Sequence, residues 1–431
     1  MNLETLIEFF SLQNPNVRYV VLGSVLLSVS SAIVGCFTFL KKKALLGDVV
    51  SHAVLPGICI SFMVSGTKDP FLLIIGAFLS GWLSIIILDY IVANSKIKED
   101  TATGLSLSVF FGVGILLLTV IQHSGNAAQS GLDSFLFGKA AALVGKDLLA
   151  FSIIASIILI VVYLFYKEFE LVCFDQEYAR SIGVPVKRIE LLLTSITVLA
   201  VVTGIQAVGV VLMSAMLITP AAAGKFWTNK LSVMLLLASL FGAFSGIAGA
   251  YISYTAPSMP TGPWIVVVLS FIAILSFFFA PEKGILIKLF KQRKIRLQLL
   301  EENLLKSFYK IGEINADFTA ARSNEELIEI RRFSTAQFKE GLSRLSNQGF
   351  IKKTNGTWSL TNDGLQKGMR VVKLHRLWEL YLTKYLRIAP DHVHEDADTI
   401  EHVITPEIEE RLEKLLEYPE ADPHSSNIPY N

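Results

Sequence analysis

Cysteine and charge are both scarce in this chain of 431 residues. The three cysteines, Cys36, Cys59 and Cys173, form no Cys-x-x-Cys pair, so neither a disulfide framework nor a thiolate metal site is indicated. Charged residues make up 17% and hydrophobic residues 52%, which is too apolar for an ordinary soluble protein. The sequence has no G-x-x-x-x-G-K-[ST] phosphate loop, and residues 1–16 show no cleavable signal peptide. We therefore predict a membrane protein that is not an enzyme and cannot hydrolyse ATP alone.

Long apolar segments fill residues 17–281, whereas residues 291–431 are rich in Glu, Lys and Arg. The apolar segments have the length of about 20 residues that crosses a bilayer as a helix. We predict eight or nine spans, because 189–223 could be one span plus a re-entrant piece. The predicted spans are 17–39, 45–65, 70–93, 103–121, 148–166, 189–206, 207–223, 231–254 and 263–280.

Basic residues follow the first, third, fifth, seventh and last predicted spans, beginning with Lys41-Lys42-Lys43. The loops on the opposite side are nearly free of them. Lys and Arg accumulate in cytosolic loops, so the pattern predicts an N-terminus outside and a C-terminal domain in the cytosol.

Two ionisable residues, Asp48 and His52, lie inside the second span, in the stretch LLGDVVSHAVLPG. Such residues cost a few kcal/mol in the hydrocarbon, and their spacing puts both on one helix face. Together they form a mixed oxygen and nitrogen donor set that suits Mn²⁺, Fe²⁺ or Zn²⁺. The alternative is a structural hydrogen bond between them that ties two helices. Ser51 is expected to pack, and His123 and Asp133 are left outside the predicted site.

The loop FDQEYARSIGVPVKRIE, residues 174–190, is polar between two apolar spans. Its first part favours a helix up to Ser181, and Gly183 and Pro185 then break that helix. The loop is either a plain cytosolic connector or a short helix that receives a partner protein.

Several stretches between 41 and 284 resemble the permease subunit of bacterial ABC importers for manganese, zinc or iron, the ABC-3 family. They include KKKALLGDVVSHAVLPGI, DSFLFGKA, FDQEYARSIGVPV and AVGVVLMSAMLITPAAAGKFW. The resemblance implies a multi-pass protein of the bacterial inner (cytoplasmic) membrane, surrounded by lipid, with Asp48 and His52 on the metal path. It also implies three protein partners: a second permease copy or paralogue, an extracytoplasmic solute-binding protein, and a separate ABC ATPase. The ATPase would couple through Glu177, Ala179 and Gly183.

The polar region begins with a pattern of helix, helix and hairpin over residues 297–372. Residues 297–312 read as an amphipathic helix, and Ser334 with Gln337 forms a capping box at the start of the next. Asn355-Gly356 then lies between two extended segments, which is a strong hairpin signal. This order predicts a winged helix-turn-helix, a fold that serves DNA binding and also protein interaction.

Residues 373–431 concentrate imidazole and carboxylate groups at helical spacing. The region from about 300 to 430 resembles the diphtheria-toxin-repressor family of metal-dependent regulators, which includes the manganese-transport regulators. The resemblance implies a primary metal site at Asp398, Glu401 and His402, and an ancillary one at His375, Glu379 and His394. The alternative is a polar dimer surface with incidental histidines.

Two departures bear on this second resemblance. Asp398 stands where iron-type members have a cysteine, and Asn303 stands where members supply a Met or Asp ligand. An all-oxygen-and-nitrogen set leans toward Mn²⁺ or Fe²⁺ without excluding Zn²⁺. An amide oxygen at Asn303 is a weaker ligand, which predicts an incomplete or low-affinity primary site.

We therefore predict an all-α polytopic permease domain over 1–290, a cytosolic α+β winged helix-turn-helix over 297–372, and metal-binding and dimerisation helices over 373–431. The predicted function is the permease subunit of an ATP-driven importer for Mn, Fe or Zn, with a metal-responsive repressor-like tail. One alternative is a membrane-tethered, metal-dependent transcription regulator that binds DNA. Another is an ion-coupled secondary transporter, against which the 174–190 loop argues.

Overall fold

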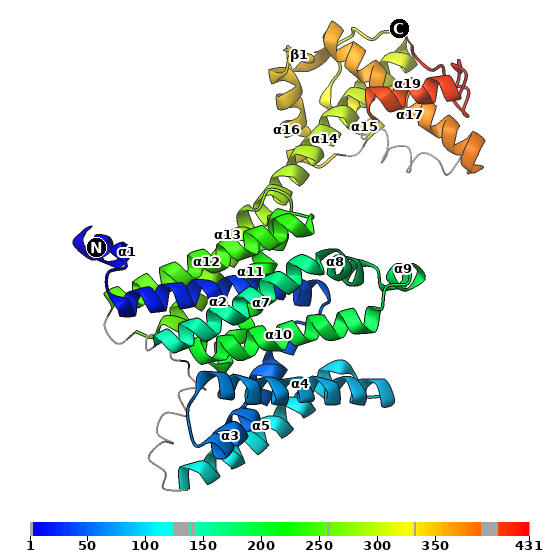
Figure 1. The fold of residues 1–431 in the computed structure, drawn as a ribbon. Helices are drawn as coiled ribbons and strands as arrows, with labels where there is room; N and C mark the ends of the chain where they lie inside the picture. The colour runs from blue at the N-terminus through cyan, green and yellow to red at the C-terminus, as the bar shows by residue number, and fades with distance from the viewer. Residues whose placement is uncertain are drawn as a thin grey trace. The chain divides into compact units, whose positions relative to one another are not determined.

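The computed structural model describes residues 3–123, 138, 143–256, 259–331, 333–388 and 404–430. The chain forms two compact units, Met1–Lys288 and Leu289–Asn431, with the helix α14 running across the boundary (Figure 1). The elements that precede α14 are α1 (Leu3–Ser11), α2 (Pro15–Leu40), α3 (Leu46–Ser65), α4 (Pro70–Asn94), α5 (Glu99–His123), α7 (Gly145–Leu164), α8 (Tyr166–Phe174), α9 (Gln176–Ser181), α10 (Val186–Val208), α11 (Val210–Trp227), α12 (Leu231–Thr255) and α13 (Thr261–Phe279).

Nine of the helices within the described ranges are long and apolar enough to cross a membrane. They are α2, α3, α4, α5, α7, α10, α11, α12 and α13. The predicted all-α architecture of this region is confirmed. The prediction succeeded because an apolar run of about 20 residues crosses a bilayer as a helix. The ambiguous stretch 189–223 contains two helices, α10 and α11, which meet at Gly209.

The first unit is arranged around α10. Figure 1 shows α3, α4 and α5 gathered on one side of α10, and α2, α11, α12 and α13 on the other. The largest apolar core joins these groups: it contains Val50 and Val54 of α3, Val198 and Val201 of α10, and Phe37 of α2. Because α3 packs on α4, α5 and α11, its position is fixed on several sides.

The helices α3 and α4 approach each other at Gly57 and Gly76. A Cβ at Gly57 would lie 2.0 Å from the carbonyl oxygen of Gly76, and a Cβ at Gly76 would lie 2.4 Å from that of Gly57. Small residues permit this contact, which is how helices gain packing energy in lipid. The Ser80 hydroxyl adds a 2.6 Å hydrogen bond to the carbonyl of Ala53 across the same interface.

The second unit contains most of α14 (Ile285–Asn315) and then a compact set of short elements. The stretch 291–296, which the sequence left between the predicted domains, is helical as part of α14. The elements that follow are α15 (Asn324–Ile330), α16 (Thr335–Asn347), β1 (Ile351–Thr354), β2 (Thr357–Leu360), α17 (Asn362–Leu386) and α19 (Pro406–Leu415).

The predicted winged helix-turn-helix is present in this second unit. Leu304 and Phe308 of α14 form its core with Leu342 and Leu345 of α16 and with Ile351 of β1. The antiparallel hairpin pairs Ile351 with Leu360.

Local capping explains where these elements begin and turn. Asn355 and Gly356 both have positive φ, at 52° and 86°, as a two-residue hairpin turn requires. Ser334 accepts the backbone N–H of Gln337 at 3.4 Å, which is half of the expected capping box. In place of the other half, the Ser334 hydroxyl bonds to the Gln337 side-chain oxygen at 2.8 Å.

Candidate metal path, coupling helix and tail site

Asp48 and His52 lie on α3, directly after the connection from α2. Asp48 is in the first turn of α3, His52 is one turn further, and both side chains are half-buried. Within the described residues, neither side chain makes a hydrogen bond or an ion pair, and the Nδ1 atom of His52 is buried without a partner. The ring of His52 instead packs edge-on against Phe111 of α5, with 5.1 Å between centroids. The predicted alternative, a structural hydrogen bond between the two residues, does not form.

Further donor atoms lie in the same turns of α3. The hydroxyl of Ser51 is buried and has no partner among the described residues. Pro56 lies inside α3 and has no N–H, so the carbonyl of His52 cannot receive the usual helical bond from four residues ahead. A buried polar atom without a hydrogen bond lowers the stability of the fold by about 1–3 kcal/mol. The unbonded oxygen and nitrogen atoms in these turns are therefore available to bind a ligand.

The loop after α7 folds into α8 and the short helix α9, which begins at Gln176. Asp175 caps α9 by accepting the N–H of Tyr178 at 2.9 Å. The helix ends at Ser181, and Gly183 follows with φ of 86°, a conformation that favours glycine. The predicted helix and its breakers are thus present. We call α9 the coupling helix from here on.

The predicted coupling residues differ in exposure. Glu177 is exposed, but Ala179 is fully buried, so its side chain anchors the coupling helix to the core. The sequence interpretation missed three exposed apolar side chains beside it: Phe174, Tyr178 and Ile182 are 57%, 56% and 54% exposed. Their signal was available, because large apolar residues are unexpected in a polar loop.

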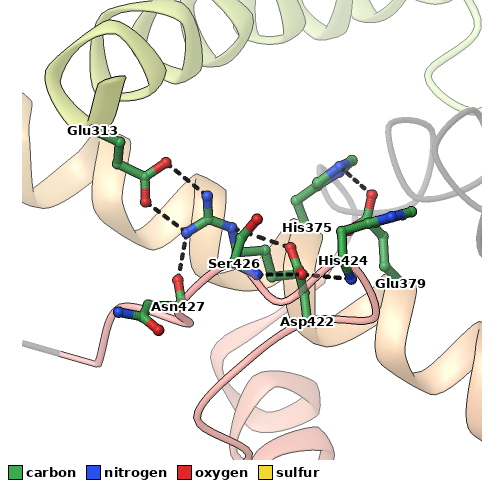
Figure 2. Close-up of polar contacts among 8 residues, drawn as sticks. Glu313, His375, Glu379, Asp422, His424, Ser426 and Asn427 are labelled. Atoms are coloured by element: carbon green, nitrogen blue, oxygen red, sulfur yellow. Dashed lines mark hydrogen bonds and ion pairs between the residues drawn. The ribbon is translucent and has the colours of Figure 1, made fainter. Parts of the chain in front are cut away.

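In the second unit, His375 and Glu379 lie one turn apart on α17 and are both buried. Figure 2 shows their contact, in which Nε2 of His375 is 2.8 Å from Oε1 of Glu379. Asn303 of α14 and His375 line one pocket of about 400 Å³, and the Asn303 side-chain oxygen is buried without a partner. The other four predicted tail ligands lie outside the described residues: His394, Asp398, Glu401 and His402. The loop residue Asp133 also lies outside them.

The C-terminal segment is held against α17 next to these residues. Arg376 bonds to Glu313 of α14 and to the carbonyl of Asn427 (Figure 2). Asp422 accepts the backbone N–H groups of His424 and Ser426 at 2.8 and 2.9 Å. This network fixes the side of α17 that carries His375.

His123 and the winged helix are less informative as sites. His123 is exposed, and its ring nitrogen bonds to the carbonyl of Thr119 in its own helix at 2.8 Å. The exposed side of α16 carries Lys339 beside Glu340, so its charge is mixed. Arg344 of α16 is tied to Glu301 of α14 at 2.5 Å.

Residues 13–280 match the family described as the ABC 3 transport family. Residues 361–430 match the Iron dependent repressor, metal binding and dimerisation domain. The chain is 38% identical over 410 residues to the Manganese transport system membrane protein MntC of Bacillus subtilis, covering 95% of this chain and 93% of the relative. It is 43% identical to the Zinc transport system membrane protein TroC of Treponema pallidum over 67% of this chain and 95% of that protein.

A solved structure agrees with the fold of the first unit. PsaBC from Streptococcus pneumoniae, solved in complex with Fab, superposes with a TM-score of 0.58 at 34% identity. The match covers 64% of this chain and 97% of that chain.

Proposed function

Because the chain belongs to the ABC 3 transport family, we propose that it is the permease subunit of an ATP-driven importer of divalent transition metal. It is a multi-pass membrane protein and a transport component rather than an enzyme. The observation that carries the proposal is the pair Asp48 and His52 on α3, whose donor atoms are uncommitted inside an apolar helix bundle.

The chemistry of the pair indicates the class of cargo. A carboxylate and a neutral imidazole suit Mn²⁺, Fe²⁺ or Zn²⁺, and relatives are named for manganese and for zinc. Metal crossing the bundle would exchange its water ligands for Asp48 and His52, and the unbonded Nδ1 of His52 would gain a partner.

Three protein partners belong to the proposal. The sequence lacks a phosphate loop, so ATP hydrolysis would come from a separate ATPase bound at the coupling helix through Phe174, Tyr178 and Ile182. A second permease, as a copy or a paralogue, would complete the path, and a solute-binding protein would deliver metal from outside. The basic loops favour a bacterial cytoplasmic membrane with the N-terminus outside and the second unit in the cytosol.

The tail has two candidate functions. His375 and Glu379, together with the four predicted ligands that lie outside the described residues, would bind cytosolic metal. We propose feedback, in which the metal-loaded tail slows transport. The second candidate is a membrane-tethered DNA-binding regulator, which the winged helix-turn-helix favours and the mixed charge of α16 opposes.

The test is transport in proteoliposomes that contain the chain with its cognate ATPase and are supplied with its solute-binding protein, where internal Mn²⁺ is measured with and without ATP. Uptake that requires both ATP and the ATPase supports the proposal. Uptake driven by a proton gradient without ATPase would support a secondary transporter instead. Normal uptake in variants that lack the Asp48 carboxylate and the His52 imidazole would place the metal path elsewhere.

A further inference from the structure

Glu190, in the second turn of α10, binds two residues from separate parts of the first unit. It accepts a 3.0 Å hydrogen bond from Nε2 of Gln176, the first residue of the coupling helix. It also forms an ion pair with Lys41, the residue that directly follows α2. The side chains of Lys41 and Glu190 are only 10% and 34% exposed, so water screens this pair weakly.

Lys41 begins the short connection between α2 and α3, and backbone hydrogen bonds hold this connection at both ends. The N–H of Lys43 bonds to the carbonyl of Thr38 at 3.1 Å, and the N–H of Leu46 bonds to that of Lys43 at 3.2 Å. These bonds join the end of α2 to the first turn of α3, which carries Asp48.

An apolar contact supports the same junction. Phe169 of α8 packs against Phe37 of α2 with 5.4 Å between ring centroids, and both side chains are fully buried. Packing of this kind holds α8 on α2 but is not directional. The ion pair of Lys41 with Glu190 is more specific, because its energy depends on the distance between the two charged groups.

We infer that Gln176, Glu190 and Lys41 form a link that passes movement of the coupling helix to Asp48. These residues position the metal ligand and do not bind the metal themselves. The inference rests on the proposed binding of an ATPase at the coupling helix. In an importer with this link, ATP hydrolysis changes the position of Gln176, and Asp48 follows through Glu190 and Lys41.

The experiment measures metal transported per ATP hydrolysed, in proteoliposomes containing the full chain and its ATPase. Glu190→Gln keeps the shape of the side chain but removes its charge. We expect the variant to bind the ATPase and hydrolyse ATP, while metal moved per ATP falls at least about fivefold, the low end of the usual range for coupled sites. Gln176→Ala leaves the Lys41 pair intact and should give a smaller fall in the same direction.

The double variant Lys41→Glu/Glu190→Lys restores the pair with its charges exchanged and should recover most of the lost transport per ATP. Asp89→Asn is the matched control, because Asp89 lies on α4 and pairs at 3.8 Å with Lys43 rather than with Lys41. It should leave the ratio unchanged. A normal ratio in Glu190→Gln with ATPase still bound, or no recovery in the exchanged pair, overturns the link alone. Failure of the unaltered chain to bind an ATPase would instead overturn the proposed function.

Discussion

Arg376 and Glu313 form a two-pronged ion pair between α17 and α14, with Nη1 to Oε1 at 2.8 Å and Nη2 to Oε2 at 2.7 Å. Both groups come from the second unit, and Arg376 is buried. Burial works against its charge but is outweighed by Glu313 and Asp422, so the pKa of Arg376 is raised. The pair therefore holds the side of α17 that carries His375.

Breaking this pair should destabilise the tail. We expect Glu313→Gln to cost about 3 kcal/mol, because it leaves a buried guanidinium without its main partner. Hydrogen exchange of the full chain in detergent would detect the lost stability as faster exchange of the Ile428 backbone N–H. This N–H bonds to the carbonyl of Glu420 at 2.8 Å. Lys414→Gln is the control, since it removes a pair that is more than half exposed and should change little. Equal exchange in both variants would contradict the structural importance of Arg376.

The tail should lose stability in acid through Glu409. Burial would raise the pKa of this carboxyl, but Lys373 at 2.7 Å and Arg370 at 2.8 Å outweigh it, and the net pKa is lowered. A lowered folded pKa gives stability that is complete above the ordinary value of 4.5 and is lost as the pH falls through the folded value. Tail unfolding measured from pH 7 downward should therefore steepen below about 4.5. Glu409→Gln should weaken this dependence of tail stability on pH below about 4.5. If the dependence is unchanged in the variant, other groups cause the loss of stability in acid.

Removing either proposed path ligand should abolish most uptake. We expect Asp48→Asn and His52→Ala to lower the initial rate of Mn²⁺ uptake at least about tenfold, since loss of mere supporting contacts to a metal ligand already costs 10–100-fold. Ser61→Ala is a control on the same helix, because its hydroxyl bonds to the carbonyl of Leu72 on α4. Membrane insertion and ATPase binding should be normal in all three.

The coupling helix should lose its partner when its exposed apolar side chains become polar. Tyr178→Asp should greatly reduce co-purification of the ATPase, because it places a charge in an apolar contact. Gly183→Val should weaken it as well, by forcing a branched residue into a left-handed conformation. Tyr90→Asp, on an exposed position of α4, is the control. Undiminished association in the first two variants would place the docking site elsewhere.

Feedback through the tail predicts a difference between the full chain and a chain ending at Lys288, where the first unit ends. With internal Mn²⁺ varied and no DNA present, uptake by the full chain should slow as internal metal rises, by a factor of roughly 5–150 at saturation. The shortened chain should not slow. If both slow equally, the tail does not gate transport and the DNA-binding function becomes the better explanation.

Sequence patterns predicted the parts of this protein that depend on local rules. Apolar runs placed the spans, and Asn355-Gly356 placed the hairpin. Spacing alone placed Asp48 and His52 on one face.

Contacts between distant residues could not be read in the same way. Lys41 and Glu190 are 149 positions apart, and Arg376 and Glu313 are 63 apart. Which charges meet depends on how helices pack, and periodicity does not encode that. The absence of a hydrogen bond between Asp48 and His52 also required side-chain positions, since their spacing alone permits one.

The contact of Gly57 with Gly76 holds α3, the helix that carries Asp48 and His52, against α4. With the two backbones touching, α3 cannot turn about its own axis without driving its carbonyl groups into α4. A larger side chain at either position would therefore push α3 and α4 apart. Asp48 and His52 lie on one helix of this closely joined pair, so we expect any rearrangement of α3 to move α4 with it.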